Sequence, residues 1–169
     1  VDCQRIRQFL EEEANLLLRD NVKMHFTASA WVLNPSKNKV LMLYHNIYQS
    51  WSWSGGHADG EGDLLSVAMK EVKEESGLVS LKPLSDSPIS IEILGVQPHY
   101  KKQKYVSAHL HLNYTFLLQN TKEEKLKICP EENSKVGWLS PDEAVRSSTE
   151  AWMKPIYKKL NQKMRKYLG

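Results

Sequence analysis

A helix-forming segment near the middle of the chain, residues 63–77, constrains the fold more than any other stretch. It begins at Asp63, whose side chain suits the N-cap, and it stops at Gly77, the residue type that usually follows a helix end. One face of the helix is apolar, and it consists of Leu64, Leu65, Ala68, Met69 and Val72. This face predicts a helix that is anchored against the rest of the protein.

The same helix carries three glutamates within about one turn, on a stripe beside the apolar one. They are Glu71, Glu74 and Glu75, and like charges at these spacings repel by a few tenths of a kcal/mol per pair, roughly. The simplest interpretation is a solvated acidic face. A carboxylate cluster on a rigid helix is also a site for hard divalent cations, and a bound metal turns the repulsion into attraction. Glycines before the helix allow a polyphosphate to approach the backbone closely.

Length and composition exclude several classes of protein. The 169 residues suit one domain, 41% of them are hydrophobic, and a net charge of +3 does not by itself indicate nucleic-acid binding. Cys3 and Cys129 have no metal-type spacing and are interpreted as free thiols in a reducing compartment. No segment approaches the roughly 18 apolar residues of a membrane helix. A cytoplasmic enzyme or binding domain is therefore expected.

The first twenty residues carry charge throughout, which argues against a secretory signal. Because translated chains begin with methionine, Val1 indicates a sequence that starts inside its gene product or after processing.

Apolar periodicity predicts helices and strands that are mixed along the chain. Helices are expected at about residues 3–19, 63–76 and 155–168, with a further helix opened by the PDEA segment at 141–144. Strands are expected at 25–33, 39–46, 89–99, 105–116 and 136–140. This mixture predicts an α/β domain with a mixed sheet.

The glycines and glutamates around the central helix also follow a known pattern. Residues 56–78 resemble the signature of the Nudix hydrolase family, with matches at Gly56, Glu71, Val72, Glu74, Glu75, Gly77 and Leu78. Gly62 departs from the signature because it stands at the position of a glutamate. Lys70 replaces an arginine, which keeps the charge but loses the planar fork that holds a carboxylate at two points. Ser54 stands where many relatives have proline.

The resemblance implies a Nudix-type α/β/α sandwich with a mixed β-sheet, formed as a single domain by residues 1–169. It implies a hydrolase acting on acid anhydrides in phosphorus-containing compounds. The reaction would be attack by water on a phosphorus of a nucleoside diphosphate that is linked to another moiety. The implied cofactor is Mg²⁺, with Mn²⁺ as a substitute.

The resemblance also assigns roles to individual residues. Glu71, Glu74 and Glu75 would hold the metal together with the carbonyl of Gly56. Glu71 and Glu74 are the catalytic candidates, and Glu71 is the first choice to orient or deprotonate the water.

Relatives often supply a further glutamate from a loop before a late strand that contains tryptophan. Glu132 precedes Trp138 and suits this metal-binding role, and Glu131 is the alternative. Loop glutamates without a task in the site are equally compatible with the sequence.

Histidines give weaker signals. His109 and His111 share one face of a strand, a spacing at which two histidines can bind a metal. The sequence places no cysteine or third histidine beside them, so a groove or solvent face is favoured over a zinc site. In a groove they would meet phosphate or sugar groups of the substrate. His57 follows the glycine pair directly and is expected to border the site.

Two tryptophans and the basic tail complete the candidates. Trp51 and Trp53 point to the same side of an extended segment, where Trp53 would stack on a base or pack under the central helix. Packing is the favoured interpretation. The tail from Lys154 to Lys166 is rich in basic residues. A solvated face of a docked helix is favoured there over contact with RNA.

Three functions remain open at this point. The leading hypothesis is a Mg²⁺-dependent pyrophosphohydrolase acting on a small-molecule nucleotide or related diphosphate. The first alternative is a nucleotide-binding or regulatory Nudix domain without turnover, which the Gly62 departure favours. The second is a diphosphate isomerase, which needs a catalytic cysteine that neither Cys3 nor Cys129 is well placed to supply. No membrane or nucleic-acid partner is expected, and the sequence leaves a homodimer open.

Overall fold

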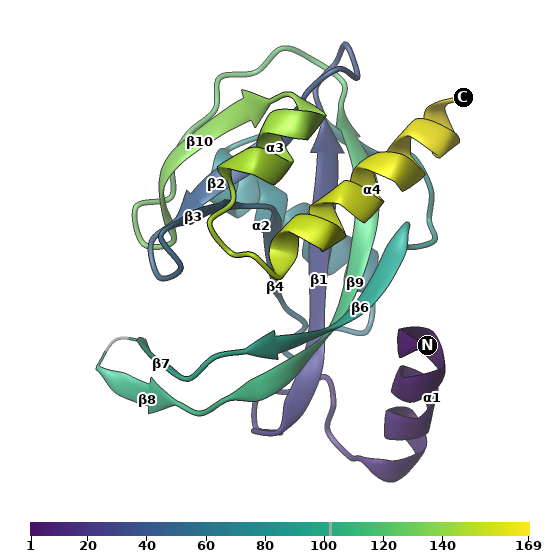
Figure 1. Ribbon diagram of the computed structural model, residues 1–169, viewed down its shortest axis with the longest axis vertical. Helices are drawn as coiled ribbons and strands as arrows, with labels where there is room; N and C mark the ends of the chain where they lie inside the picture. The colour runs from purple at the N-terminus through teal and green to yellow at the C-terminus, as the bar shows by residue number, and fades with distance from the viewer. Residues whose placement is uncertain (102) are drawn as a thin grey trace.

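The computed structural model describes residues 1–101 and 103–169, and a mixed β-sheet lies at its centre (Figure 1). The strands are β1 (Met24–Leu33), β2 (Val40–His45), β3 (Ser50–Ser52), β4 (Ser54–His57), β5 (Leu81–Pro83), β6 (Ser90–Val96), β7 (His99–Lys101), β8 (Lys104–Val106), β9 (His109–Asn120) and β10 (Asn133–Leu139). The helices are α1 (Asp2–Glu12), α2 (Leu64–Ser76), α3 (Pro141–Ser147) and α4 (Met153–Leu168).

The order of strands along the sheet is β10-β2-β1-β9-β5, with β3 on β2, β4 on β1 and β6 on β9. The central pair β1 and β9 is parallel, and β2, β4, β5, β6 and β10 pair antiparallel. Helix α2 covers one face of the sheet, whereas α3 and α4 cover the other (Figure 1). The expected α/β/α sandwich with a mixed sheet is confirmed.

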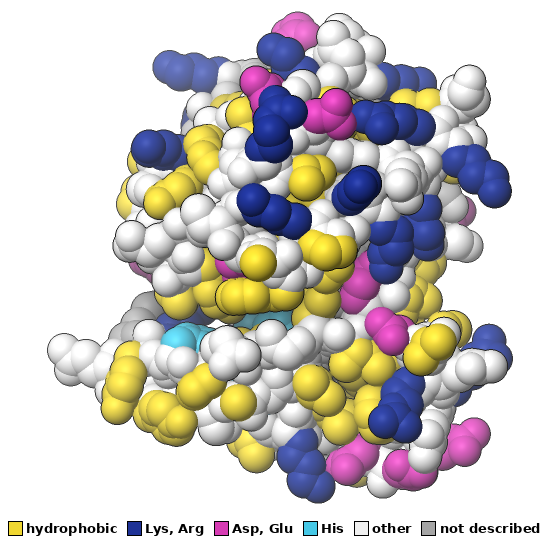
Figure 2. Space-filling view, in the orientation of Figure 1, with side chains coloured by type: hydrophobic (Ala, Val, Ile, Leu, Met, Phe, Trp, Pro, Cys, Tyr) yellow, Lys and Arg dark blue, Asp and Glu magenta, His cyan; other side chains and the backbone are white. Residues whose placement is uncertain are grey.

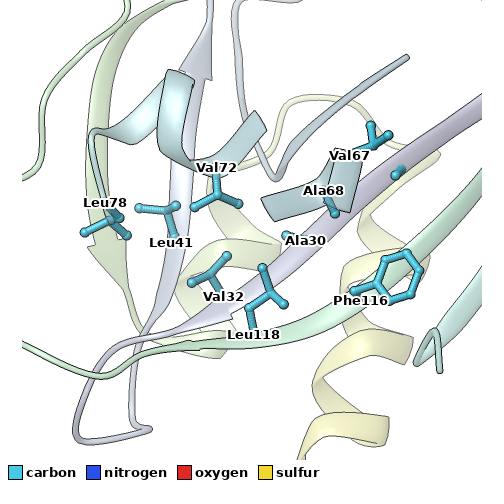
Figure 3. Packing of buried hydrophobic residues seen from close by; sticks show 10 residues of the cluster. Ala30, Val32, Leu41, Val67, Ala68, Val72, Leu78, Phe116 and Leu118 are labelled. Atoms are coloured by element: carbon cyan, nitrogen blue, oxygen red, sulfur yellow. The ribbon is translucent and has the colours of Figure 1, made fainter. Parts of the chain in front are cut away.

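The apolar face of α2 packs on alternate residues of the central strands. Val67, Ala68 and Val72 of the helix contact a layer from the strands that consists of Ala28, Ala30, Val32, Leu41, Phe116 and Leu118 (Figure 3). Leu65 is half-buried at the edge of this layer. Because successive residues of a strand point to opposite faces, the even-numbered residues of β1 and β9 face α2.

The opposite face of the sheet packs on the C-terminal helix. Trp31 of β1 stacks on Tyr157 of α4, with ring centroids 5.4 Å apart, and both side chains are fully buried. Trp53 meets the same tyrosine edge-on, and its backbone N–H donates to the Tyr157 hydroxyl at 3.3 Å. The favoured expectation that Trp51 and Trp53 pack under the central helix is therefore wrong: both belong to the α4 side of the sheet.

A third cluster joins the N-terminal segment to one end of the sheet. It consists of Ile6, Leu16, Met24, Phe26, Ala58 and Leu112. Helix α1 ends at Glu12, well before the expected residue 19, and the next residue, Glu13, is extended. Asn15 then has a positive φ of 58°, which continues no helix, and the turn it forms brings Leu16 into the cluster.

Local end signals placed two of the helices correctly. The Asp63 side chain accepts a hydrogen bond from the Ser66 N–H, and Gly77 ends α2 in the left-handed conformation at φ 76°. Helix α3 begins with a complete capping box between Ser140 and Glu143. The expected docked helix at the C-terminus is also present, as α4.

The expected strand 105–116 is two strands. Its first part, β8, pairs with β7 in a separate hairpin, whereas β9 begins at His109 and pairs with β1 and β6. The polar side of this alternating segment is not a solvent face, since Asn113 and Thr115 are fully buried. Among the described residues, no helix is both long and apolar enough to cross a membrane.

Candidate active site

The carboxylate of Glu71 lies directly over the backbone of Gly56. Strand β4 pairs with β1 so that Gly56 stands opposite Ala28, on the face of the sheet that α2 covers. A Cβ atom on residue 56 would lie 2.6 Å from each carboxylate oxygen of Glu71. Only glycine allows this approach, which brings a carboxylate against the backbone of strand β4.

Glu75 points into the protein from the same helix. Its side chain is 6% exposed, and its Oε1 accepts hydrogen bonds from the Ser54 hydroxyl at 3.0 Å and from the Gly55 N–H at 3.1 Å. Burial raises the pKa of Glu75 to about 8, although the Ser54 hydrogen bond opposes that shift. The signature glutamates are therefore not on one solvent-facing stripe, since Glu75 fastens α2 to the start of β4.

Glu74 and Glu132 are the more exposed members of the group. Glu74 lies 3.8 Å from the ammonium of Lys70, one helical turn away, and Glu132 lies 3.8 Å from that of Lys101 on β7. Glu132 follows the loop before β10 as expected, and its charge acts on both Glu71 and Glu75. The structure thus brings the late-loop glutamate to the carboxylates of α2.

The electrostatics of Glu71 reflect this crowding. Burial raises the pKa of Glu71 above its usual value, and the neighbouring charge of Glu74 raises it further. Lys70 opposes the shift, whereas Glu132 and Asp59 add to it. A divalent cation would reverse these repulsions, and the donor set of carboxylate and carbonyl oxygens is the one that Mg²⁺ prefers. The residues present therefore fit such a cation.

The departure at Gly62 lies in open space. A Cβ on Gly62 would meet no atom of residues 1–101 or 103–169 within 4 Å, and the φ of Gly62 is outside the left-handed region. Nothing in the fold therefore requires glycine at this position.

Arg19 and Asp59 border the site and give no motif in the sequence. The guanidinium of Arg19 binds the Asp59 carboxylate at two points, 2.7 and 2.8 Å, and so joins the N-terminal segment to the loop before α2. The Gly60 N–H also donates to the carbonyl of Leu17 at 2.9 Å. These contacts connect segments 40 residues apart, which explains why sequence reasoning missed them.

Histidines gather on the other face of the sheet. His57 follows Gly56 in β4 and therefore points away from Glu71. His25 and His111 are paired across β1 and β9, with His109 beside them. The ring centroid of His57 lies 5.1 Å from that of His25 and 5.0 Å from that of His111. From the sequence, His57 is expected to border the carboxylate site. The β-sheet lies between the His57 ring and the carboxylates of α2.

Desolvation keeps the pKa of His25, His57 and His111 below the usual value for histidine. Desolvation lowers the pKa of His57 to about 3 and that of His111 to about 2, and neighbouring positive groups such as Arg19 or the other histidines act in the same direction. The pKa of His25 is lowered for the same main reason. Sequence reasoning found three of the four histidines in this group and missed His25, because its register with His111 is a tertiary property.

Comparison with known proteins agrees with the geometry. A family model of the NUDIX domain matches residues 23–160, which include β1, the glycine pair, α2 and the first half of α4. No curated protein matches the sequence.

Solved structures share the fold. An Ap4A hydrolase from C. elegans in a binary complex is 18% identical, with 81% of this chain and 95% of that chain covered and a TM-score of 0.61. A NUDIX-family hydrolase from Clostridium perfringens is 17% identical, with coverage of 83% and 96% and a TM-score of 0.60. The E. coli dihydroneopterin triphosphate pyrophosphohydrolase is 16% identical, with coverage of 79% and 92% and a TM-score of 0.57.

The sandwich with a glutamate-rich helix against a glycine-containing strand defines the class: hydrolases that act on pyrophosphate bonds. The chain belongs to the Nudix family.

Proposed function

We propose that the chain is a Mg²⁺-dependent pyrophosphohydrolase, with Mn²⁺ as a substitute, that cleaves a nucleoside diphosphate linked to another moiety. The observation that carries the proposal is the Glu71 carboxylate, which lies over Gly56. This carboxylate interacts electrostatically with those of Glu74, Glu75 and Glu132. The names of two structural relatives, an Ap4A hydrolase and a dihydroneopterin triphosphate pyrophosphohydrolase, support a polyphosphate substrate.

The cation would be held by the carboxylates of Glu71, Glu74 and Glu75 and by the carbonyl of Gly56, with Glu132 as a further ligand. When bound, it neutralises charge on the diphosphate and on the leaving group. Glycine at position 56 lets the Glu71 carboxylate lie against the backbone of β4, and Ser54 binds one oxygen of Glu75.

Glu71 would accept the proton of the attacking water. The oxygen of that water forms a bond to phosphorus, the bond between phosphorus and the bridging oxygen breaks, and the leaving phosphate departs with the electron pair of that bond. The position of the Glu71 carboxylate over Gly56 suits it to this role, since a general base must lie within reach of the proton that it accepts.

A substrate screen tests the proposal. Purified protein is incubated with Mg²⁺ and a panel of dNTPs, ADP-ribose, NADH, dinucleoside polyphosphates, nucleotide sugars and capped RNA, and released phosphate is measured after a phosphatase step. Glu71→Gln should lose about 100-fold or more of the rate, because a group that acts in the transition state is removed. Glu123→Gln, at an exposed position, is the control. Full turnover in excess chelator would contradict the metal requirement.

A nucleotide-binding domain without turnover is the second candidate, and Gly62 is the observation that favours it. In that case the panel yields no phosphate, while a nucleotide still raises the thermal midpoint of the protein in the presence of Mg²⁺.

A further inference from the structure

Three histidines form a tight cluster of potential metal ligands on the face of the sheet that α2 does not cover. One ligand atom from each of His25, His109 and His111 lies within 4.8 Å of the ligand atoms of the other two. Histidine side chains are visible in cyan within the recess that crosses the surface in Figure 2. Across the described residues, the α2 carboxylates form no cluster as tight as this one.

Hydrogen bonds to backbone carbonyls occupy Nδ1 of His25 and of His109, so Nε2 is the atom of each ring that can bind a metal. Nδ1 of His25 lies 3.1 Å from the Asn21 carbonyl, and Nδ1 of His109 lies 2.8 Å from the Ser107 carbonyl. Since a carbonyl only accepts, both Nδ1 atoms carry the hydrogen and both Nε2 atoms keep a lone pair. Such contacts orient the histidine ligands of metal sites and fix their tautomer.

Among the described residues, Nε2 of His25 has no hydrogen-bond partner. His25 is 4% exposed, and its Nε2 is fully buried without a hydrogen bond. A buried polar atom left without a partner is costly and rare in native proteins, and a bound ion would supply the partner that this nitrogen lacks. The adjacent Nε2 atoms of His109 and His111 lie 3.1 Å apart and share a hydrogen bond, which a bound ion would replace. Two nitrogens at about 2.0–2.1 Å from one tetrahedral zinc lie about 3.3 Å apart, which is close to this spacing.

We infer that the Nε2 atoms of His25, His109 and His111 bind a zinc ion, or another late first-row divalent metal, on the opposite face of the sheet from the α2 carboxylates. Imidazole nitrogens suit zinc, cobalt and nickel, whereas Mg²⁺ prefers oxygen ligands. The site rests on the parallel register of His25 with His111, so two paired strands hold its ligands rigidly. Three protein ligands leave a further position of the ion for water or a substrate group.

Metal titration of the untagged protein tests the inference, because a polyhistidine tag would itself bind zinc. The chain is freed of metal with a chelator and titrated with Co²⁺, followed by visible absorption, and then with Zn²⁺ in competition with a chromophoric chelator. One ion per chain should bind with submicromolar affinity, raise the thermal midpoint and resist displacement by excess Mg²⁺. Binding weaker than the chelator can detect, or full displacement by Mg²⁺, overturns the proposal.

Matched variants place the ion on these residues. His109→Asn should lower the affinity for Zn²⁺ at least 100-fold, since even partners that only orient a ligand contribute about 10–100-fold. His99→Asn, on neighbouring β7, should bind as the natural chain does. Unchanged affinity in His109→Asn, with circular dichroism confirming the fold, excludes the site. Glu71→Gln should keep its zinc, which separates this site from the proposed hydrolase, and loss of zinc in that variant would place the ion at the carboxylates.

Discussion

The Ser54 hydroxyl donates a hydrogen bond to Oε1 of Glu75 across the junction between β4 and α2. Both side chains are buried, and the Gly55 N–H shares the same acceptor. A residue that departs from the usual proline thus supports a signature glutamate directly.

Ser54→Ala should destabilise the protein. The variant leaves Glu75 with one donor in a buried position, and an unsatisfied buried group costs about 1–3 kcal/mol. Urea denaturation measures the loss, and Ser36→Ala, at an exposed turn, is the control. Equal stability of the two variants would mean that the Ser54 hydrogen bond contributes nothing.

Gly56→Ala should reduce turnover with little change in stability. The added methyl group would displace the Glu71 carboxylate, which is the far end of a flexible side chain and can move. Misplacing a reacting group by about 1 Å can cost about 100-fold in rate. Gly137→Ala, where the nearest atom would be 3.8 Å away, is the matched control in the phosphate-release assay. A fully active Gly56→Ala variant would contradict the proposed role of Glu71 in the reaction.

Gly62→Glu should be tolerated and should leave activity unchanged or raise it. The position is open and its backbone suits any residue, so the new carboxylate adds negative charge near the proposed cation at no steric cost. Rates at limiting Mg²⁺ measure the effect, with Gly62→Gln as the uncharged control. If Gly62→Glu is active and the natural chain is not, the natural chain is a nucleotide-binding domain and the proposed hydrolase function is wrong.

Two substitutions on α2 test which side chains anchor that helix. Val72→Asp should prevent folding, because Val72 is fully buried and aspartate would place an unpaired charge there. Leu65→Asp should cost about 1–3 kcal/mol, since Leu65 is half-buried at the edge of the same layer. Thermal midpoints and solubility measure both, and Lys73→Ala on the exposed side is the control. An unchanged thermal midpoint for Val72→Asp would contradict the assignment of Val72 to the buried face of α2.

Glu150→Gln should stabilise the protein at neutral pH. Burial raises the pKa of Glu150, so its ionisation favours the unfolded chain, and the natural protein loses stability as the pH rises through that pKa. Glutamine cannot ionise and removes this loss. The variant should therefore have the higher thermal midpoint at pH 7, and the difference should shrink below about pH 4, where unfolded glutamate is also protonated. The same gain at both pH values would assign it to packing.

Local signals predicted the parts of the fold that local energetics decide. Asp63 and Gly77 marked the ends of α2 because capping depends on neighbouring backbone groups. The predicted location of Trp53 was wrong because both faces of the sheet are apolar. Only the contact with Tyr157 of α4 determines on which face Trp53 packs. The spacing of the glutamates along the chain did not reveal that Glu75 turns inward, since that depends on Ser54 and Gly55.

The parallel ladder between β1 and β9 joins residues such as Thr27 and Asn113, which are 86 positions apart. During synthesis, β1 therefore leaves the ribosome long before β9 is made. Until then, the side chains of β1 that are buried in the folded protein stay exposed. Closing so long a loop is slow, and strands exposed in the meantime are prone to aggregation. Nascent chains that end before His109 should remain unfolded, whichever helices they already contain.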